Sequence, residues 1–191
     1  TYISKMLLNN QILIFEEFLR DFNAELTGSF IAKKKKLNQK TVSNYLNKLE
    51  TETILKSKTQ GKNKLYSLNL NNKEIIKNFI ISAEHLRTIN FYKKHLLIKE
   101  IAEKIKNHIK GTAIIFGSYV KNTQKKDSDL DLLIIGKCNE KEINNLSKTY
   151  KLEISLKIYP KLEKDILTKE VIKNHIIIKN TEQFIEEVLN G

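Results

Sequence analysis

The sequence predicts an α+β protein of two domains joined by a helical connector, over residues 1–71, 72–110 and 111–191. Three observations predict this division. The first part shows helical patterns followed by two short strands around a glycine. The middle part shows helical periodicity only. The last part alternates apolar strands with helical segments, as expected for an α/β fold with a small mixed sheet.

The first domain contains three predicted helices, over residues 9–24, 30–36 and 40–52. Apolar residues recur at helical spacing in the first and the third of these segments. In the third, Val42 and Leu46 are one turn apart and are expected to face inward. Short amide and hydroxyl side chains occupy the opposite side of the same helix, which leaves a polar face directed at a partner or at water.

Two strands follow the helices, over residues 54–58 and 64–68, and Gly61 lies at the tip of the turn between them. Three helices followed by a basic hairpin resemble a winged helix-turn-helix domain. This resemblance implies binding of double-stranded DNA by the third helix and the hairpin. The alternative is a protein-interaction module whose third helix is a solvated surface.

The side chains expected to contact DNA are polar or basic and lie on these two elements. Asn and Gln can pair with adenine edges, and lysines suit phosphates. The candidates are Gln39, Lys40, Thr41, Ser43, Asn44, Asn47 and Lys48 on the helix, and Lys58, Lys62 and Lys64 on the hairpin. The run from Lys33 to Lys36 is either a nucleic-acid patch or a solvated helix end, because cations also favour a helix C-terminus.

The connector is predicted to form two helices or one kinked helix, because its helical pattern slips between Thr88 and Tyr92. A homodimer through the helices of residues 72–110 is a further expectation. The histidines of this segment, His85, His95 and His108, are spaced too irregularly for a metal site on one helical turn, which favours surface or packing roles.

Two apolar strands open the last domain. A turn at Gly117 and Ser118 and a spacer over residues 119–128 separate them, and the second strand begins with Asp129 and Asp131. Residues two apart on a strand share a face, so the two carboxylates repel each other and require cations. Mg²⁺ takes carboxylate and phosphate oxygens. Glycine permits close backbone approach, and a serine at a helix start can seat a phosphate. An ordinary strand-turn-strand with a solvated acidic end is the alternative.

This motif resembles that of the DNA polymerase β-like nucleotidyltransferase superfamily, and of its minimal members in particular. The spacing from Ser118 to Asp129 is similar to that of antitoxins that pair with HEPN-type toxins. Together with the winged helix, the chain resembles a group of archaeal winged-helix nucleotidyltransferases. The resemblance implies two Mg²⁺ ions held by Asp129 and Asp131, with ATP or another nucleoside triphosphate as the substrate.

The family places a third carboxylate on the strand after the Asp-x-Asp strand. Here the strand is predicted over residues 152–159, where Glu153 is the one acid, so Glu153 is the expected third catalytic and metal-binding residue. The alternative is an exposed strand residue beside Lys157. Lys121 is expected to bind the triphosphate with Gly117 and Ser118, because it follows them closely.

The remaining elements follow from local patterns. Gly136 is expected to end the second strand, and a helix is predicted over residues 140–150. The strand over residues 152–159 alternates apolar and polar side chains. A short strand over residues 176–178 and a final helix complete the predicted sheet and its cover.

The composition limits the function classes. A formal net charge of +12 and a pI of about 9.6 favour an anionic partner. Cys138 is the single cysteine, which excludes a disulfide framework and a zinc site of several cysteines. The sequence shows neither an apolar run of membrane-spanning length nor a signal peptide, so we expect a cytoplasmic protein without a membrane partner.

Two functions follow from these patterns. The first is an enzyme that transfers a nucleoside monophosphate, AMP from ATP foremost, to a macromolecular hydroxyl. The acceptor would be a toxin-like partner protein ahead of an RNA. The second is a DNA-binding transcriptional regulator whose nucleotidyltransferase domain is catalytically weak or inactive and senses nucleotide.

Overall fold

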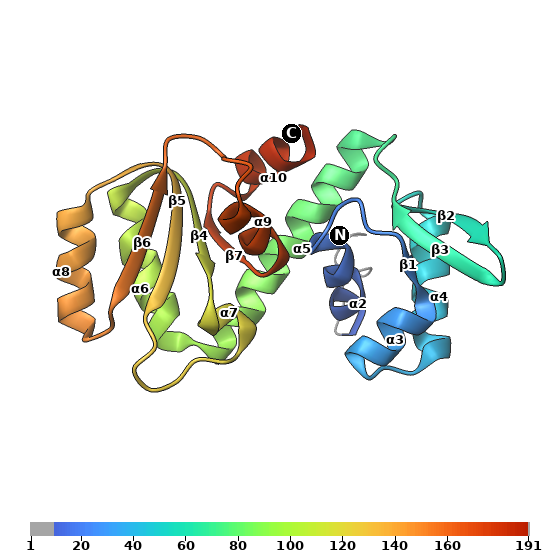
Figure 1. The fold of residues 1–191 in the computed structure, drawn as a ribbon, viewed down its shortest axis with the longest axis horizontal. Coiled ribbons are helices and arrows are strands. Elements are labelled where there is room, and N and C mark those ends of the chain that lie inside the picture. Colours follow the sequence, from blue (N-terminus) through green and yellow to red (C-terminus); the bar gives the residue numbers. More distant parts are fainter. Residues whose placement is uncertain (1–9, 191) are drawn as a thin grey trace. The chain divides into compact units, whose positions relative to one another are not determined.

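A computed structural model describes residues 10–190 of the chain. It contains two compact units, with described residues 10–83 and 84–190, and α5 (Lys73–Lys94) contributes residues to both. The elements of each unit are labelled in Figure 1. In the described part of the chain, no helix is both long enough and apolar enough to cross a membrane.

The first unit has the element order and strand order of a winged helix. The order along the chain is α2 (Asn10–Leu19), β1 (Leu26–Thr27), α3 (Gly28–Lys35), α4 (Gln39–Thr51), β2 (Leu55–Gln60) and β3 (Asn63–Leu68). The antiparallel sheet has the order β1-β3-β2, and β2 and β3 form the wing. The predicted helices and hairpin are confirmed, whereas the two-residue β1 is too short to leave a pattern in the sequence.

Capping residues set the starts of the two central helices of this unit. Thr27 accepts a hydrogen bond from the Phe30 amide at the start of α3. Asn38 accepts from the amides of Lys40 and Thr41 at the start of α4. Both side chains satisfy donors that have no partner inside the helix. The first helix ends at Leu19, earlier than the predicted residue 24.

An aromatic core holds the unit together. Phe15 and Phe18 of α2 are fully buried, and the Phe15 ring meets that of Phe79 edge to face at 4.8 Å. Phe79 comes from α5, so this contact fastens the start of α5 to the first unit. Burying each such ring stabilises the fold by about 2–3 kcal/mol.

The second unit is built on a four-stranded mixed sheet. Its elements are α6 (Leu96–Ile105), η1 (Lys106–His108), β4 (Ile109–Phe116), α7 (Ser118–Lys121), β5 (Leu130–Cys138), α8 (Glu140–Tyr150), β6 (Ile154–Tyr159), α9 (Ile166–Lys173), β7 (Ile176–Lys179) and α10 (Thr181–Asn190). The strand order is β6-β5-β4-β7. Strands β5 and β6 are parallel, and the other two pairs are antiparallel, which confirms the predicted small mixed sheet.

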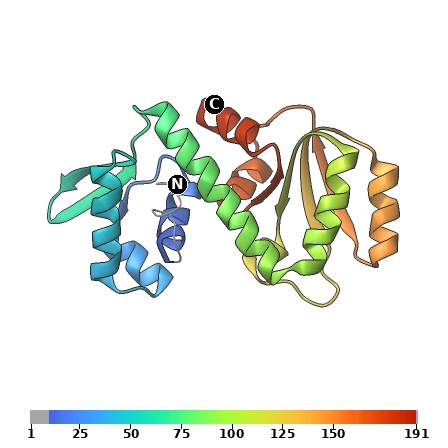
Figure 2. The same cartoon turned by 180° about the vertical axis from the view of Figure 1, so that it is seen from behind.

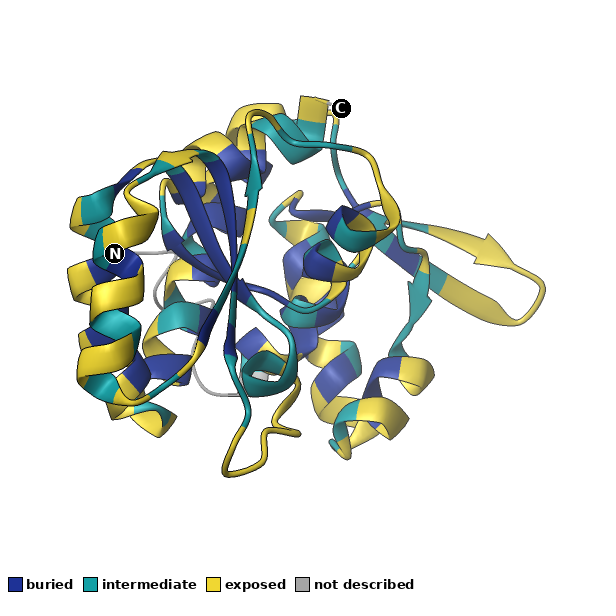
Figure 3. Cartoon of the chain, turned by 60° about the vertical axis from the view of Figure 1, so that its left-hand side comes forward, coloured by how far each residue is buried: buried dark blue, intermediate teal, exposed yellow. Residues whose placement is uncertain are grey.

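Helices α6 and α8 cover one face of this sheet, as Figure 2 shows from behind. Ile101 and Ile105 of α6 and Ile143 of α8 are fully buried against apolar strand residues such as Leu132 and Ile134. The middle parts of β4 and β5 are buried, and Figure 3 shows buried strands inside this sheet and exposed residues on the outer surfaces of the helices. The apolar runs of β4 and β5 are therefore the core strands that the sequence predicts.

Two boundaries in the second unit differ from the sequence prediction. The connector breaks at His95, after the predicted slip between Thr88 and Tyr92, and gives two helices. Gly136 does not end β5, which continues to Cys138. Gly136 pairs with Gly111 of β4, and both have positive φ angles of 130° and 124°. A Cβ at either glycine would lie within 2.3 Å of a backbone oxygen on the opposite strand. The two glycines therefore allow the backbones of β4 and β5 to approach closely, and β5 continues past Gly136.

Candidate active site in the second unit

The turn from β4 into α7 brings the backbone of Gly117 against the carboxylate of Asp131. The register pairs Phe116 with Asp131 across β4 and β5. Gly117 has a φ of 74°, and a Cβ on it would lie 1.9 Å from Asp131 Oδ2. No side chain fits in this space, so glycine is required both by the backbone conformation and by the neighbouring carboxylate.

The two aspartates predicted from the motif lie together at the start of β5. Burial and then repulsion from Asp129 raise the pKa of Asp131, and the Ser118 amide and Lys121 partly oppose this shift. A raised pKa means that the ionised carboxylate is disfavoured in the folded protein. A divalent cation between the two carboxylates would remove this cost, so the donor set fits a hard cation such as Mg²⁺.

Ser118 supplies two groups to the same site. Its amide donates to Asp131, and its buried Oγ has no hydrogen-bond partner among the described residues. A buried hydroxyl without a partner is able to bind a group from outside the chain, such as a water molecule or a phosphate oxygen. The phosphate seat predicted at Gly117 and Ser118 therefore relies on the hydroxyl, because the Ser118 amide already holds the carboxylate.

Tyr119 connects the turn to the loop that carries the first aspartate. Its hydroxyl donates to the Ser128 carbonyl at 3.4 Å, and its ring meets the ring of His95 at 5.9 Å. Burial and the charge of Asp129 raise the pKa of the Tyr119 hydroxyl, which keeps the phenol protonated. Sequence reasoning did not select Tyr119, although its place directly after Ser118 could have indicated a supporting role.

Glu153 lies directly before β6, and its side chain is exposed. Its backbone carbonyl accepts from the Leu130 amide at 2.8 Å, but the residue that the register pairs with Asp131 is Ser155. In the described part of the chain, no three His, Cys, Asp or Glu side chains are close enough to bind one metal ion. The role of Glu153 as a third ligand therefore stays a prediction.

Lys121 ends α7, and its side chain is exposed. Its charge opposes the upward shift of the Asp131 pKa. The pairing with Lys173 lowers the pKa of Glu170 on α9, and the charge of Lys121 adds a smaller effect in the same direction. Lys121 thus lies within electrostatic range of both the aspartates and α9. Its predicted role in binding the triphosphate stays a prediction.

The candidate DNA-binding residues of the first unit fall into two groups. Gln39, Lys40, Thr41, Asn44 and Lys48 are exposed on α4, and Lys62 is exposed on the wing.

The other group is already engaged within the unit. Asn47 accepts from the Tyr66 hydroxyl at 2.7 Å, and Lys64 pairs with Glu50 at 2.6 Å. Ser43 is half-buried, and Lys58 pairs with Glu25 at 2.6 Å on the surface.

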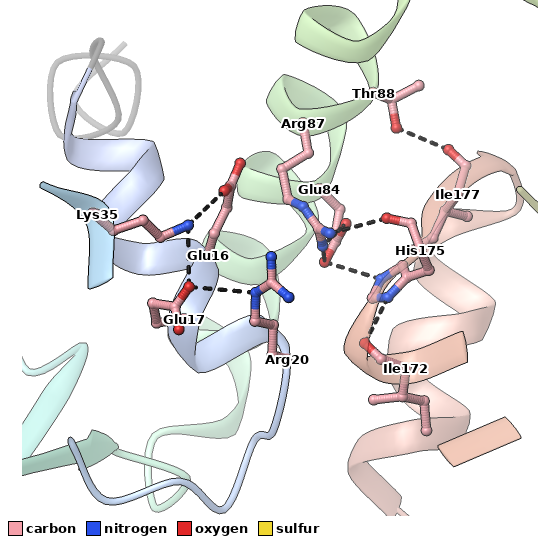
Figure 4. Close-up of polar contacts among 10 residues, drawn as sticks. All are labelled: Glu16, Glu17, Arg20, Lys35, Glu84, Arg87, Thr88, Ile172, His175 and Ile177. Atoms are coloured by element: carbon pink, nitrogen blue, oxygen red, sulfur yellow. Dashed lines mark hydrogen bonds and ion pairs between the residues drawn. The ribbon is translucent and has the colours of Figure 1, made fainter. Parts of the chain in front are cut away.

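The lysine run of α3 is partly used inside the first unit, as Figure 4 shows for Lys35. Lys35 contacts Glu17 at 3.1 Å, and Lys34 contacts the same carboxylate at 2.7 Å. Glu17 is buried on α2, and Arg20 lies 3.3 Å from it. Two of the four lysines therefore fasten α3 to α2, a role that neither of the two alternatives for the run included.

A buried ionic cluster in the second unit was not predicted from the sequence. Arg87 donates to both oxygens of Glu84, at 2.7 and 2.9 Å, and to the His175 carbonyl at 2.9 Å. Nε2 of His175 lies 3.2 Å from Glu84 Oε1, as Figure 4 shows. On its own, burial would raise the pKa of Glu84, but Arg87 and His175 outweigh it and lower that pKa. The cluster joins α5 to the start of β7.

Comparison with known proteins places these features in a family. A family model described as a nucleotidyltransferase domain matches residues 96–187. A relative from Methanocaldococcus jannaschii, named "Putative protein adenylyltransferase", is 35% identical over 91 residues, which cover 45% of this chain and 89% of the relative. The chain belongs to the nucleotidyltransferase family. The nucleotidyltransferase match runs from α6 into α10 and contains Gly117, Ser118 and both aspartates.

Two solved structures show weaker likeness. A homodimeric winged helix-turn-helix DNA-binding domain from Mycobacterium bovis, titled a possible ArsR-family transcriptional regulator, is 22% identical. The likeness covers 44% of this chain and 78% of that one, with a TM-score of 0.34. The archaeal chromatin protein TrmBL2 is 14% identical, with coverages of 99% and 95% and a TM-score of 0.29. At these TM-scores neither likeness bears on the function of the nucleotidyltransferase described here.

Proposed function

We propose that this nucleotidyltransferase transfers a nucleoside monophosphate, AMP from ATP foremost, to a hydroxyl of a macromolecule in a Mg²⁺-dependent reaction. The observation that carries the proposal is the arrangement at the β4–α7 turn. There Gly117 and two mutually repelling carboxylates meet the Ser118 hydroxyl, which has no hydrogen-bond partner in the part of the chain that the structure describes. The name of the Methanocaldococcus jannaschii relative supports adenylyl transfer to protein as the first reaction to test.

Asp129 and Asp131 would hold the cation, and the Ser118 hydroxyl with Lys121 would orient the phosphates. Bound Mg²⁺ would neutralise the negative charge that develops on the phosphates during transfer. The acceptor hydroxyl forms a bond to the α-phosphorus, the bond from that phosphorus to the bridging oxygen breaks, and pyrophosphate leaves. The hydroxyl proton is released to solvent. Gly117 lets the backbone of the turn lie directly against the Asp131 carboxylate, in a space that has no room for a side chain at position 117.

The first unit is proposed to bind double-stranded DNA through α4 and the wing. The exposed polar residues of α4, including Asn44 and Lys48, are free to face a duplex. The net charge of +12 favours contact with phosphates. Binding of this kind would couple the transferase to a DNA site.

A second candidate function has its own observation. The register places Ser155, not an acid, beside Asp131, and Glu153 lies exposed before the strand. Two carboxylates with substrate phosphates suffice to bind one Mg²⁺ with a nucleotide. A regulator that binds nucleotide without transferring it is the function that this observation favours.

One experiment separates the two functions. The protein is incubated with Mg²⁺ and with nucleoside triphosphates labelled at the α-phosphate, together with its co-expressed genomic neighbours and their RNA. Transfer of label to a protein or RNA, with release of pyrophosphate, supports the enzyme. Asp131→Asn should abolish the label. Asp127→Asn is the matched control, because it removes an exposed charge from the same loop. Bound nucleotide without any covalent label supports the regulator.

A further inference from the structure

An apolar patch lies on the second unit where α5 passes into α6. Five residues line a cavity of about 240 Å³ there: Ile89, Tyr92, Lys93, Leu96 and Lys99. We name these residues the corner patch. Leu96 is 70% exposed and Ile89 is 49% exposed, so both leave much apolar surface in water. Exposed apolar residues around a hollow are typical of a surface that binds another molecule.

Tyr92 adds a polar requirement to the patch. Its side chain is 8% exposed, and its hydroxyl is buried without a hydrogen-bond partner among the described residues. A buried hydroxyl of this kind usually has a partner, so an occupant of the cavity that accepts a hydrogen bond would satisfy it. Carboxylate and carbonyl oxygens are such acceptors.

The charges around the patch determine what kind of occupant fits. Lys93 and Lys99 line the cavity, and neither forms an ion pair with another described residue. The acids of α6 are already engaged within the unit. Glu100 accepts from the Tyr150 hydroxyl at 2.5 Å and lies 3.5 Å from Lys104. Glu103 pairs with Lys106 at 2.7 Å. The patch therefore offers unpaired positive charge and no unpaired negative charge from α6.

This charge pattern disfavours a second copy of the chain as the occupant. In a two-fold dimer the same patch would face itself, so the two lysines of one copy would lie across from the two lysines of the other. Like charges brought together at an interface reduce affinity. We propose instead that the corner patch docks an acidic, amphipathic helical segment of a partner protein. Its apolar side chains would cover Ile89 and Leu96, and its carboxylates would pair with the two lysines.

The position of the patch relates it to the active site of the same unit. His95 directly precedes Leu96, and its ring contacts that of Tyr119 in α7. Tyr119 follows Ser118, so a segment docked on the corner patch lies near the nucleotide seat. The docked partner would then be the acceptor of the nucleotidyl group, a step that rests on the proposed function.

The test measures docking in the absence of nucleotide, so that it is independent of transfer. Three fluorescein-labelled peptides are titrated with the full chain and followed by anisotropy. One is an amphipathic helix with leucines on one face and glutamates on the other. The second replaces the glutamates with lysines, and the third scrambles the acidic sequence. We expect the acidic amphipathic peptide to bind at least about tenfold more tightly than the other two.

Variants of the chain locate the binding. Leu96→Asn and the double variant Lys93→Glu, Lys99→Glu should each weaken the acidic peptide at least about tenfold. Ile166→Asn is the matched control, because Ile166 is 83% exposed on α9 of the same unit. This variant should bind the acidic peptide as tightly as wild type does. All four altered side chains are exposed, so the fold should persist in every variant.

Three outcomes would overturn the proposal. The first is equal affinity for the three peptides, and the second is an affinity that Leu96→Asn leaves unchanged. The third is a concentration-dependent dimer in sedimentation equilibrium that Leu96→Asn abolishes, because a second copy would then be the occupant. Specific docking without any covalent label in the transfer assay would keep the docking surface and reject only the acceptor role.

Discussion

The polar residues of the wing and those of the β4–α7 turn differ in how far the chain satisfies them. On the wing, Lys64 pairs with Glu50, and Tyr66 donates to Asn47. At the turn, Ser118 Oγ has no hydrogen-bond partner within residues 10–190, and burial and Asp129 destabilise the charged form of Asp131. Satisfied polar groups stabilise a fold, whereas unsatisfied ones cost free energy unless a ligand binds. The contrast supports the proposal that the turn binds a ligand.

The largest expected effect is that of Asp131→Asn on nucleotide binding at the turn. Removing one carboxylate should weaken Mg²⁺-dependent binding of a nonhydrolysable ATP analogue by about a hundredfold or more, because the cation loses a charged ligand. The free protein should become more stable at neutral pH. The raised pKa of Asp131 means that its ionised form costs stability above that pKa, and the cost disappears as the pH falls through it.

Calorimetric titration and thermal unfolding between neutral and acidic pH test both halves of this prediction. The stability gain of Asp131→Asn over wild type should shrink as the pH falls, and Asp127→Asn should show neither effect. Equal and metal-independent nucleotide affinity in wild type and Asp131→Asn would remove the basis for an active site at this turn.

Glu84→Gln should have the next largest effect, on the stability of the second unit. The variant leaves Arg87 and His175 buried without their carboxylate, which costs about 3–5 kcal/mol for a broken buried pair. The pKa of Glu84 is lowered in the folded state, so its contribution is present above the ordinary value of 4.5 and is lost as the pH falls through the folded value.

Thermal unfolding as a function of pH checks this effect. Wild type should lose stability on acidification below 4.5, and Glu84→Gln should show a flatter profile in that range. Glu182→Gln on the exposed start of α10 is the control. A profile of Glu84→Gln parallel to that of wild type would show that the cluster does not couple stability to pH.

Ser155→Asp would add a third carboxylate beside Asp129 and Asp131. Neighbouring strands lie about 4.8 Å apart, so an acid at this position would stand beside Asp131. Repulsion should lower the melting temperature of the free protein, and Mg²⁺ should bind about tenfold more tightly and restore it. Ser155→Asn is the control, because Asn has the shape of Asp without its charge. Melting curves with and without Mg²⁺ are compared for the two variants and wild type. Unchanged metal affinity in Ser155→Asp would contradict this geometry.

Local patterns predicted most of the elements because their signals lie within a few residues. The Thr27 and Asn38 caps, the apolar runs of β4 and β5 and the pair of aspartates can all be identified from adjacent residues. The clash that requires Gly117 depends on a carboxylate from another strand, although the Gly-Ser motif indicated the position.

Features that depend on long-range register could not be predicted. Arg87 and His175 are 88 residues apart, and no local pattern links them. The sequence offered Glu153 as the acid of its strand, but only the pairing of β5 with β6 shows that Ser155 lies beside Asp131. The two-residue β1 exists because β3 pairs with it, and it has no pattern of its own.

The smallest expected effect separates two lysines of the wing. Lys62 is exposed and forms no ion pair with the described residues, whereas Lys64 contacts Glu50, Asn47 and the Tyr66 ring. If the wing contacts a duplex, Lys62→Ala should reduce the slope of log affinity against log salt by about one. Lys64→Ala should leave the slope nearly unchanged and destabilise the first unit by at most about 1 kcal/mol, because the ion pair is exposed.

Gel-shift titrations over a range of salt concentrations, with thermal unfolding of the same variants, measure both effects. The two residues lie on one hairpin and carry one charge each, so each variant is the control for the other. Equal loss of slope in both variants would mean that Lys64 leaves Glu50 to contact phosphate. The ion pair in the free protein would then not indicate which wing residues contact DNA. Absence of duplex binding at low salt would instead make the winged helix a protein-docking module, and the turn in the second unit would be left as the ligand site.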